Sequence, residues 1–147
     1  MIYQEYEVLT LGTELKKLLE KKSEPLMKKY DLRKIELDIL AYLSTNACGD
    51  TAKEIMKMKH ISKAHVSKSI DNLKSHGFIT VNEDSRDHRY LHISLSEKAK
   101  DVVEDFMTIH QACKDIVFRQ VTKEEREEIS KICKKMQENI RQELDNA

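Results

Sequence analysis

The stretch TAKEIMKMKHISKAHVSKSIDNLKSHG, residues 51–77, carries two short helical patterns with a brief interruption at residues 58–60. Thr51 and Glu54 have the spacing of a capping box, which predicts that a helix begins there. Ser62 is the expected cap of a second helix that runs to Gly77. Two short helices joined by a tight turn form a helix-turn-helix, so we expect this motif over residues 51–77.

The second helix of this pair, over residues 62–76, has two faces of different character. Val66, Ile70 and Leu73 fall on one side at helical spacing and should pack against a core. The outer side of the first two turns is small and polar, and consists of Ser62, Ala64, His65, Ser67 and Lys68. Such a face lets a helix approach DNA closely and contact base edges or phosphates. A plain helical hairpin that binds no DNA would show the same pattern, so both interpretations stay open here.

A change of period follows Gly77. Apolar residues alternate over 78–81 and again over 91–95, which predicts two short strands. The hydrophilic loop between them, residues 82–89, is longer than a tight hairpin turn. A hairpin directly after a helix-turn-helix is a wing, and its Arg86 and Arg89 could place a guanidinium in a minor groove. The alternative is an exposed loop whose arginines pair only with Asp84 and Asp87.

Further helices are expected on both sides of this region. One spans residues 4–22, with a kink or a fresh helix start at Ser23–Pro25, because proline removes a hydrogen-bond donor. A nearly apolar helix over residues 33–44 should be central and buried. Asp31 is a possible cap for it. After the wing, Ser96 is expected to cap a long helix. Thr122, with Glu125 at capping-box spacing, should begin the last one.

The end helices carry long apolar stripes. The N-terminal stripe is Val8, Leu11, Leu15, Leu18 and Leu19, and the C-terminal one is Ile129, Ile132, Cys133, Met136, Ile140 and Leu144. These stripes exceed what a small winged domain needs for its own core, and exposed apolar stripes usually find a partner. We therefore expect dimerisation helices over residues 1–31 and 97–147, around a DNA-binding lobe over 32–96. The predicted fold class is mainly α (α+β): a winged helix-turn-helix with a two-stranded wing and long terminal dimerisation helices.

Composition sets broad limits on the class of protein. The chain has 147 residues, about one domain, with 39% hydrophobic and 35% charged residues, 3 Gly and 1 Pro, which favours long helices. It contains no apolar run long enough for a membrane span and no signal-peptide pattern, so we expect a cytoplasmic protein. The net charge is zero, yet residues 51–76 carry six lysines against two acidic residues. This local basic bias suits a module that presents its middle to a polyanion.

Two motifs together carry a resemblance to a known family. They are Ile61-Ser62-Lys63-Ala64-His65-Val66-Ser67-Lys68-Ser69-Ile70-Asp71-Asn72-Leu73 with Gly77-Phe78-Ile79, and Asp84-Ser85-Arg86-Asp87-His88-Arg89 with Ile93-Ser94-Leu95-Ser96. With the order of elements, they make the chain resemble the multiple-antibiotic-resistance regulator (MarR) family of bacterial winged-helix transcription regulators. The resemblance implies a homodimer with interleaved terminal helices, recognition helices in successive major grooves and wing arginines at flanking minor grooves. Repression is the commoner activity in that family.

Several residues are expected to act through this arrangement. By position, Ser62, Ala64, His65, Ser67 and Lys68 would face bases or phosphates, with Arg86 and Arg89 at the wing. Lys53, Lys63, Lys68 and the wing arginines would neutralise phosphates. The resemblance also suggests a small aromatic or phenolic effector in the crevice between the terminal helices and the lobe. Its predicted lining is Met27, Tyr30, Tyr42, Phe106 and Met107, which would serve equally well as ordinary core residues.

Other function classes are weaker but open. A thiol sensor would use Cys48, which lies in a loop, whereas Cys113 and Cys133 fall on apolar helix faces. A metal sensor could use His110 and Cys113, three residues apart on one helix, although no further ligand cluster has convincing spacing. A dimeric helical interaction module without DNA binding is also possible. An enzyme has little support, because nucleophile elbow, phosphate loop and grouped carboxylates are all missing. No metal or cofactor is expected.

Overall fold

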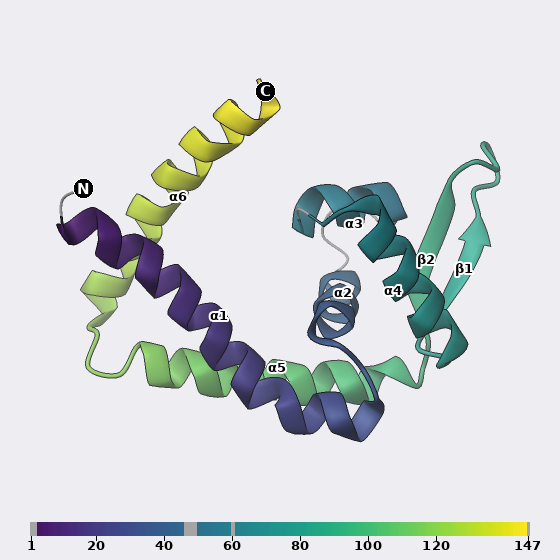
Figure 1. Cartoon of the computed structure of the whole chain (residues 1–147), viewed down its shortest axis with the longest axis horizontal. Coiled ribbons are helices and arrows are strands. Elements are labelled where there is room, and N and C mark those ends of the chain that lie inside the picture. The colour runs from purple at the N-terminus through teal and green to yellow at the C-terminus, as the bar shows by residue number, and fades with distance from the viewer. Residues whose placement is uncertain (1–2, 46–49, 60, 147) are drawn as a thin grey trace. The chain divides into compact units, whose positions relative to one another are not determined.

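The computed structural model describes residues 3–45, 50–59 and 61–146 (Figure 1). The elements are α1 (Tyr3–Tyr30), α2 (Lys34–Ser44), α3 (Ala52–Lys59), α4 (Lys63–Ser75), β1 (Ile79–Glu83), β2 (Leu91–Leu95), α5 (Ala99–Val117) and α6 (Lys123–Asp145). The chain divides into two compact units, Met1–Gln111 and Ala112–Ala147. The predicted class, mainly helical with one two-stranded antiparallel sheet, is confirmed. Within the described ranges, no helix is both long enough and apolar enough to cross a membrane.

The first helix is longer than the sequence predicts. α1 runs through Pro25 to Tyr30, so the fresh helix start expected at Ser23–Pro25 is wrong. Proline costs a helix one hydrogen bond, but a helix tolerates this loss where packing holds the turns on either side. Here the buried Ser23 hydroxyl donates to the Leu19 carbonyl at 2.6 Å, and Leu26 is buried in the core. Packing of this last part of α1 therefore outweighs the local preference of Pro25.

The turn between α1 and α2 also differs from expectation. Asp31 has a positive φ of 53° and ends α1, and the Leu32 amide donates to the Met27 carbonyl at 2.9 Å. The N-cap of α2 is Arg33, whose side chain makes no cap hydrogen bond to the described residues. The expectation that Asp31 caps α2 is wrong, because a residue in the left-handed conformation belongs to the end of the preceding helix.

The core of the first unit forms around α2, as its apolar sequence predicts. Every element of this unit contributes buried apolar side chains, from the end of α1 to the first half of α5. The largest fully buried ones are Phe78, Phe106, Leu37, Ile39, Leu40, Ile55 and Leu73. One charged residue, Glu36 of α2, is also fully buried.

The helix-turn-helix forms with the predicted caps. The Thr51 hydroxyl accepts the Glu54 amide at 3.3 Å, and the Ser62 hydroxyl accepts the His65 amide at 3.3 Å. α4 ends in a Schellman motif, in which the Gly77 amide donates to the Lys74 carbonyl and the Phe78 amide to the Leu73 carbonyl, both at 3.0 Å. Gly77 has a φ of 77°, which is why glycine suits this position.

The wing is an antiparallel hairpin, as predicted, with a shorter loop. Asn82 and Glu83 were expected in the loop but pair with His92 and Leu91, so β1 extends to Glu83 and the loop covers residues 84–90. A further antiparallel bridge joins Thr51 to His92, and the Ile93 amide donates to the Asp50 carbonyl at 3.0 Å. The segment before α3 thus adds a third short partner to the hairpin.

The last two helices confirm one predicted start and correct another. α5 begins at Ala99, and the Ser96 hydroxyl donates to the Gly77 carbonyl at 2.6 Å, so the expectation that Ser96 caps this helix is wrong. The hydroxyl instead bonds the residue that follows the C-cap of α4. Thr122 caps α6 as predicted, accepting the Glu125 amide at 3.1 Å. None of the residues of α6, all of them described, is buried.

Replacing Gly77 by alanine should lower the free energy of unfolding by about 1 kcal/mol, because a Cβ at positive φ is strained. The nearest atom to that Cβ, Lys98 Cδ, would lie 3.9 Å away, so no steric clash adds to the cost. Urea unfolding followed by circular dichroism at one fixed protein concentration measures the change.

Gly77→Asn is the matched control. Asparagine adopts the left-handed conformation more readily than alanine, so it should lower the free energy of unfolding by less than alanine does. Equal losses for the two substitutions would contradict the assigned role of Gly77.

Candidate nucleic-acid interface

The outer face of α4 is the surface that the sequence predicts to contact DNA. Every predicted residue on it is exposed: Ser62, Lys63, Ala64, His65, Ser67 and Lys68. The opposite face packs into the core through Val66 and Leu73, with Ile70 half-buried. Lys53 is exposed on α3. The structure therefore gathers the predicted α4 residues on one solvent-facing side of a helix whose other side is fixed.

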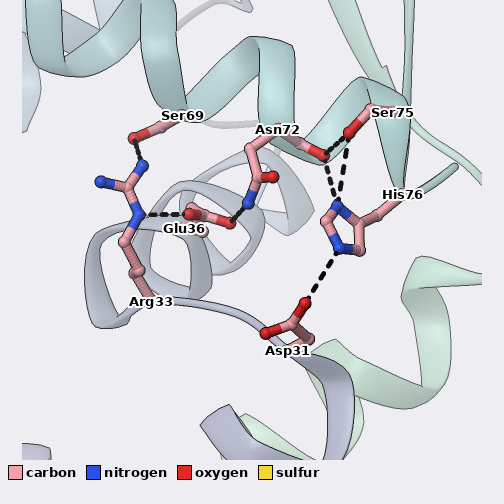
Figure 2. A network of polar contacts seen from close by, with 7 residues as sticks. All are labelled: Asp31, Arg33, Glu36, Ser69, Asn72, Ser75 and His76. Atoms are coloured by element: carbon pink, nitrogen blue, oxygen red, sulfur yellow. Dashed lines mark hydrogen bonds and ion pairs between the residues drawn. The ribbon is translucent and has the colours of Figure 1, made fainter.

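A polar network ties α4 to α2 (Figure 2). The buried Glu36 carboxylate accepts from Arg33 Nε through Oε1 and from Asn72 Nδ2 through Oε2, each at 2.6 Å. The Arg33 guanidinium also donates to the Ser69 hydroxyl at 3.3 Å. A buried carboxylate needs such partners, since an unpaired buried charge is very costly. Glu36 thereby connects the start of α2 to the middle of α4.

The C-terminal end of α4 has a second set of polar contacts. His76, at the C-cap, places Nδ1 2.8 Å from the Asn72 carbonyl, and Nε2 3.5 Å from Asp31 at the end of α1. Its ring lies parallel to that of Phe78, with centroids 6.2 Å apart. α4 is thus anchored at its middle and at its end, while its first two turns, which carry the predicted contact residues, project outward.

Sequence reasoning missed this network. A signal for it existed: Glu36 is an acid inside a nearly apolar helix, three residues after Arg33, and a charge in that place needs a partner. Asn72 and Ser69 carried no such signal, because polar residues on a short helix usually face solvent.

The wing loop is organised by two aspartates. Asp84 Oδ1 accepts the amides of Arg86, at 2.7 Å, and Asp87, at 3.2 Å. Asp87 holds the Arg89 guanidinium in a bidentate pair, with Nε–Oδ1 at 3.0 Å and a second nitrogen to Oδ2 at 2.9 Å. This pair lowers the pKa of Asp87. Among the described residues, none holds the exposed Arg86 side chain by a hydrogen bond or ion pair, so the two wing arginines differ.

The hairpin lies beside α4 in the fold (Figure 1), and its base is held by His92 of β2. Hydrogen bonds to Asp50 and then to Asp84 raise the pKa of His92 to about 9. The hydrogen bond from His92 also lowers the pKa of the Asp84 carboxyl. His92 is therefore an imidazolium at neutral pH.

The model of the SarA/Rot transcriptional regulator family matches residues 21–106, which include every α4 and wing residue described above. The chain belongs to this family. No curated protein matches it. Its structure is similar to those of a MarR protein from Peptoclostridium difficile DA00132, with 25% identity, a TM-score of 0.79 and 94% of this chain and 87% of that one covered. It is also similar to MepR in the S. aureus MepR–DNA complex, with 23% identity, a TM-score of 0.75, and 95% of this chain and 98% of that one covered.

A third neighbour, the transcriptional regulator SlyA, has a TM-score of 0.82 at 18% identity, with 92% of this chain and 95% of that one covered. Below 25% identity, such neighbours show that the fold is shared. This SarA/Rot family member is thus a transcriptional regulator with the MarR-type winged-helix fold, and the predicted resemblance is confirmed. The family and these neighbours are regulators, not enzymes, as the sequence indicated.

The five residues predicted to line an effector pocket differ in burial and in their contacts in this SarA/Rot regulator. Phe106 is buried core, in edge-to-face contact with His110. Met27 and Tyr30 pack against the core, Tyr30 also donating to Asp105 at 3.1 Å, and Met107 is exposed. Tyr42 lines a cavity of about 720 Å³ formed by the end of α2, β2 and the start of α5. The remaining described residues lining it are Leu43, Ser44, Asp50, His92, Ile93, Ser94, Leu95, Lys100, Val103 and Glu104.

The candidate sensor residues have different surroundings. Cys113 is buried and Cys133 is exposed, while Cys48 lies outside the described residues. His110 contacts the Phe106 ring. Among the residues that the structure describes, no group of three His, Cys, Asp or Glu side chains could hold a metal ion.

Replacing Glu36 by glutamine should lower the free energy of unfolding by about 2 kcal/mol, because two donors then face an amide that accepts through only one atom. Asp38→Asn on the same helix is the matched control. It removes the half-exposed i,i+4 pair with Lys34 and should cost about 0.5 kcal/mol or less. Urea unfolding of both variants measures the difference, and equal losses would show that Glu36 has no special anchoring role.

Proposed function

We propose that the protein is a homodimeric transcriptional regulator, most simply a cytoplasmic repressor, that binds an inverted-repeat DNA operator. Residues 62–76 would enter the major groove and the wing, residues 82–89, the adjacent minor groove. The observation that carries this proposal is the exposed, small and cationic outer face of α4 beside an arginine-bearing hairpin. The DNA complex of the similar S. aureus MepR supports it.

The geometry of α4 suits a groove. A helix of 13 residues is about 20 Å long, and its first two turns carry serine, alanine, histidine and lysine side chains on the outside. Ser62, Ala64, His65 and Ser67 would lie nearest the base edges. Lys53, Lys63 and Lys68 would neutralise phosphates, and Arg86 and Arg89 would reach phosphates or the minor groove from the wing.

The exposed stripes of α1 and α6 support the proposal of a dimer. On α1 they are Val8, Leu9, Leu11 and Leu15, and on α6 they are Ile129, Ile132, Met136, Ile140 and Leu144, each more than a third exposed. Apolar rows of this length on two helices are typical of a surface that a second copy covers. Dimerisation through residues 1–31 and 97–147 would hold two α4 helices one DNA turn apart, about 34–36 Å.

Ligand response is the finer part of the proposal. A small molecule changes operator binding only to the extent that it binds two conformations unequally. The cavity between α2, β2 and α5 has the volume of a small-molecule site and lies between the lobe and the first terminal helix that follows it. An aromatic or phenolic compound bound there would favour one position of α5 relative to the wing.

Selection of bound duplexes from a random pool should return an inverted repeat with half-sites centred about ten base pairs apart. On that duplex, Lys68→Ala and Arg89→Ala should each weaken binding about tenfold and reduce the salt dependence by roughly one ion. Lys131→Ala, on the polar side of α6, is the control and should bind normally. Normal binding by both interface variants would refute the assigned surface.

Ile132→Glu should raise the dimer dissociation constant by roughly 100-fold, because each copy then places an unpaired charge in an apolar interface. Lys131→Glu, on the opposite side of the same helix, should leave it unchanged. Sedimentation equilibrium measures both variants. A wild-type protein that stays monomeric at high concentration would remove the basis of the inverted-repeat model.

A further inference from the structure

A charged clamp joins the wing to the segment that leads into the helix-turn-helix. His92 of β2 points Nδ1 at Asp50 Oδ1, 2.6 Å away, and Nε2 at Asp84 Oδ2, 2.8 Å away. Carboxylate oxygens only accept hydrogen bonds, so both ring nitrogens must carry protons for the two bonds to exist together. The ring is a cation between two anions that are 42 and 8 residues distant in the sequence.

The clamp continues into the wing loop through Asp84. Its second oxygen accepts the Arg86 and Asp87 amides, and Asp87 in turn holds both the amide and the guanidinium of Arg89. Backbone bonds between Asp84 and Tyr90, at 2.9 Å, and between Tyr90 and Asp87, at 3.1 Å, close the same loop. An unbroken series of hydrogen bonds therefore runs from His92 to the backbone of one wing arginine and the side chain of the other.

The other end of the clamp is fixed to the helix-turn-helix. Asp50 directly precedes Thr51, the cap of α3, and the Ile93 amide donates to the Asp50 carbonyl at 3.0 Å. His92 also forms the bridge to Thr51. The backbone of Asp50 is thus bonded to β2 directly before the start of α3.

We propose that His92 is a positioning residue for the wing: its clamp between Asp50 and Asp84 fixes where Arg86 and Arg89 stand relative to α4 on DNA. This inference rests on the proposed DNA-binding function. A wing without the clamp would keep its strands, because the register bonds of β1 and β2 remain. Its loop would sample several positions in the free protein. Binding would then have to order both arginines, and this loss of conformational entropy would lower the affinity for DNA.

The charged surroundings of His92 support a positional role. Beside Asp50 and Asp84, the polar residues near the ring include Lys100 and Glu104 of α5 and Tyr42 of α2, which line the same cavity as His92. Lys100 is already paired with Glu97 at 2.7 Å. Asp50 and Asp84 are the groups in hydrogen-bond contact with the ring, and their bonds hold its pKa near 9, so the clamp persists throughout the neutral range.

The test is a double-mutant cycle on the selected duplex. His92→Gln should weaken binding about tenfold in the otherwise wild-type protein, but less than twofold in the Arg86→Ala/Arg89→Ala background, because it acts through those arginines. The salt dependence should fall only in the first background. Asp38→Asn is the control: it removes an ion pair, Lys34–Asp38 at 2.6 Å, on α2 and outside the proposed DNA surface, and should change binding less than twofold.

Equal losses in both backgrounds, or wild-type binding by His92→Gln, would overturn the proposal. Should that variant unfold, Asp84→Asn breaks the same bond from the wing side and takes its place in the cycle. NMR titration of the His92 ring in the free protein gives an independent readout: a midpoint near 9 that falls in Asp84→Asn supports the clamp, and a midpoint near 6.5 refutes it. Failure of the wild-type protein to select any duplex would instead refute the proposed function.

Discussion

The burial of the Glu36 carboxylate between α2 and α4 is the interaction on which the arrangement of the lobe depends. Glu36 is fully buried, and its two oxygens are satisfied by Arg33 and Asn72 at 2.6 Å. Such a group contributes little net stability, since desolvation of the charge opposes its pairing. It is demanding about geometry, however: a slide of α4 by one residue along α2 would leave a buried charge unpaired. Apolar contacts such as those of Val66 and Leu73 tolerate such a slide much better.

The composition explains why the remaining helices are left with exposed apolar rows. With 39% hydrophobic and 35% charged residues the chain has few apolar side chains, and the core around α2 contains the buried ones of the first unit. α6 keeps an apolar stripe without burying one of its described residues. A solitary helix of this kind has little tertiary stabilisation of its own. The proposed dimer would cover this stripe and would also bring together two DNA-binding lobes.

Much of the fold could be predicted from local signals. The caps at Thr51, Ser62 and Thr122, the strand alternation around Ile93 and the apolar pattern of α2 are properties of neighbouring residues, and the structure confirms them. The errors arose where distant contacts decide. Ser96 has the sequence of a cap, but its hydroxyl bonds Gly77, which lies 19 residues away. Pro25 has the sequence of a break, but buried neighbours hold α1 together. Helical periodicity was enough to predict the outer face of α4. The contacts Glu36–Asn72 and Asp50–His92–Asp84 could not be predicted in this way, because no regular sequence spacing relates the residues that they join.

The net charge of zero gives these contacts a functional meaning. Non-specific affinity for DNA grows with the number of phosphates that the protein neutralises. A protein whose net charge is zero is therefore expected to have a low non-specific affinity. On the wing, the charge of Arg89 is already balanced by Asp87, and that of His92 by two aspartates. Discrimination between DNA sites must then come from the positions of a few contacting side chains and not from the total charge. A regulator of this kind needs rigid supports behind its contact surfaces. Under the proposed function, the Glu36 contacts behind α4 and the His92 clamp behind the wing would supply that rigidity where the two DNA-binding elements meet the core.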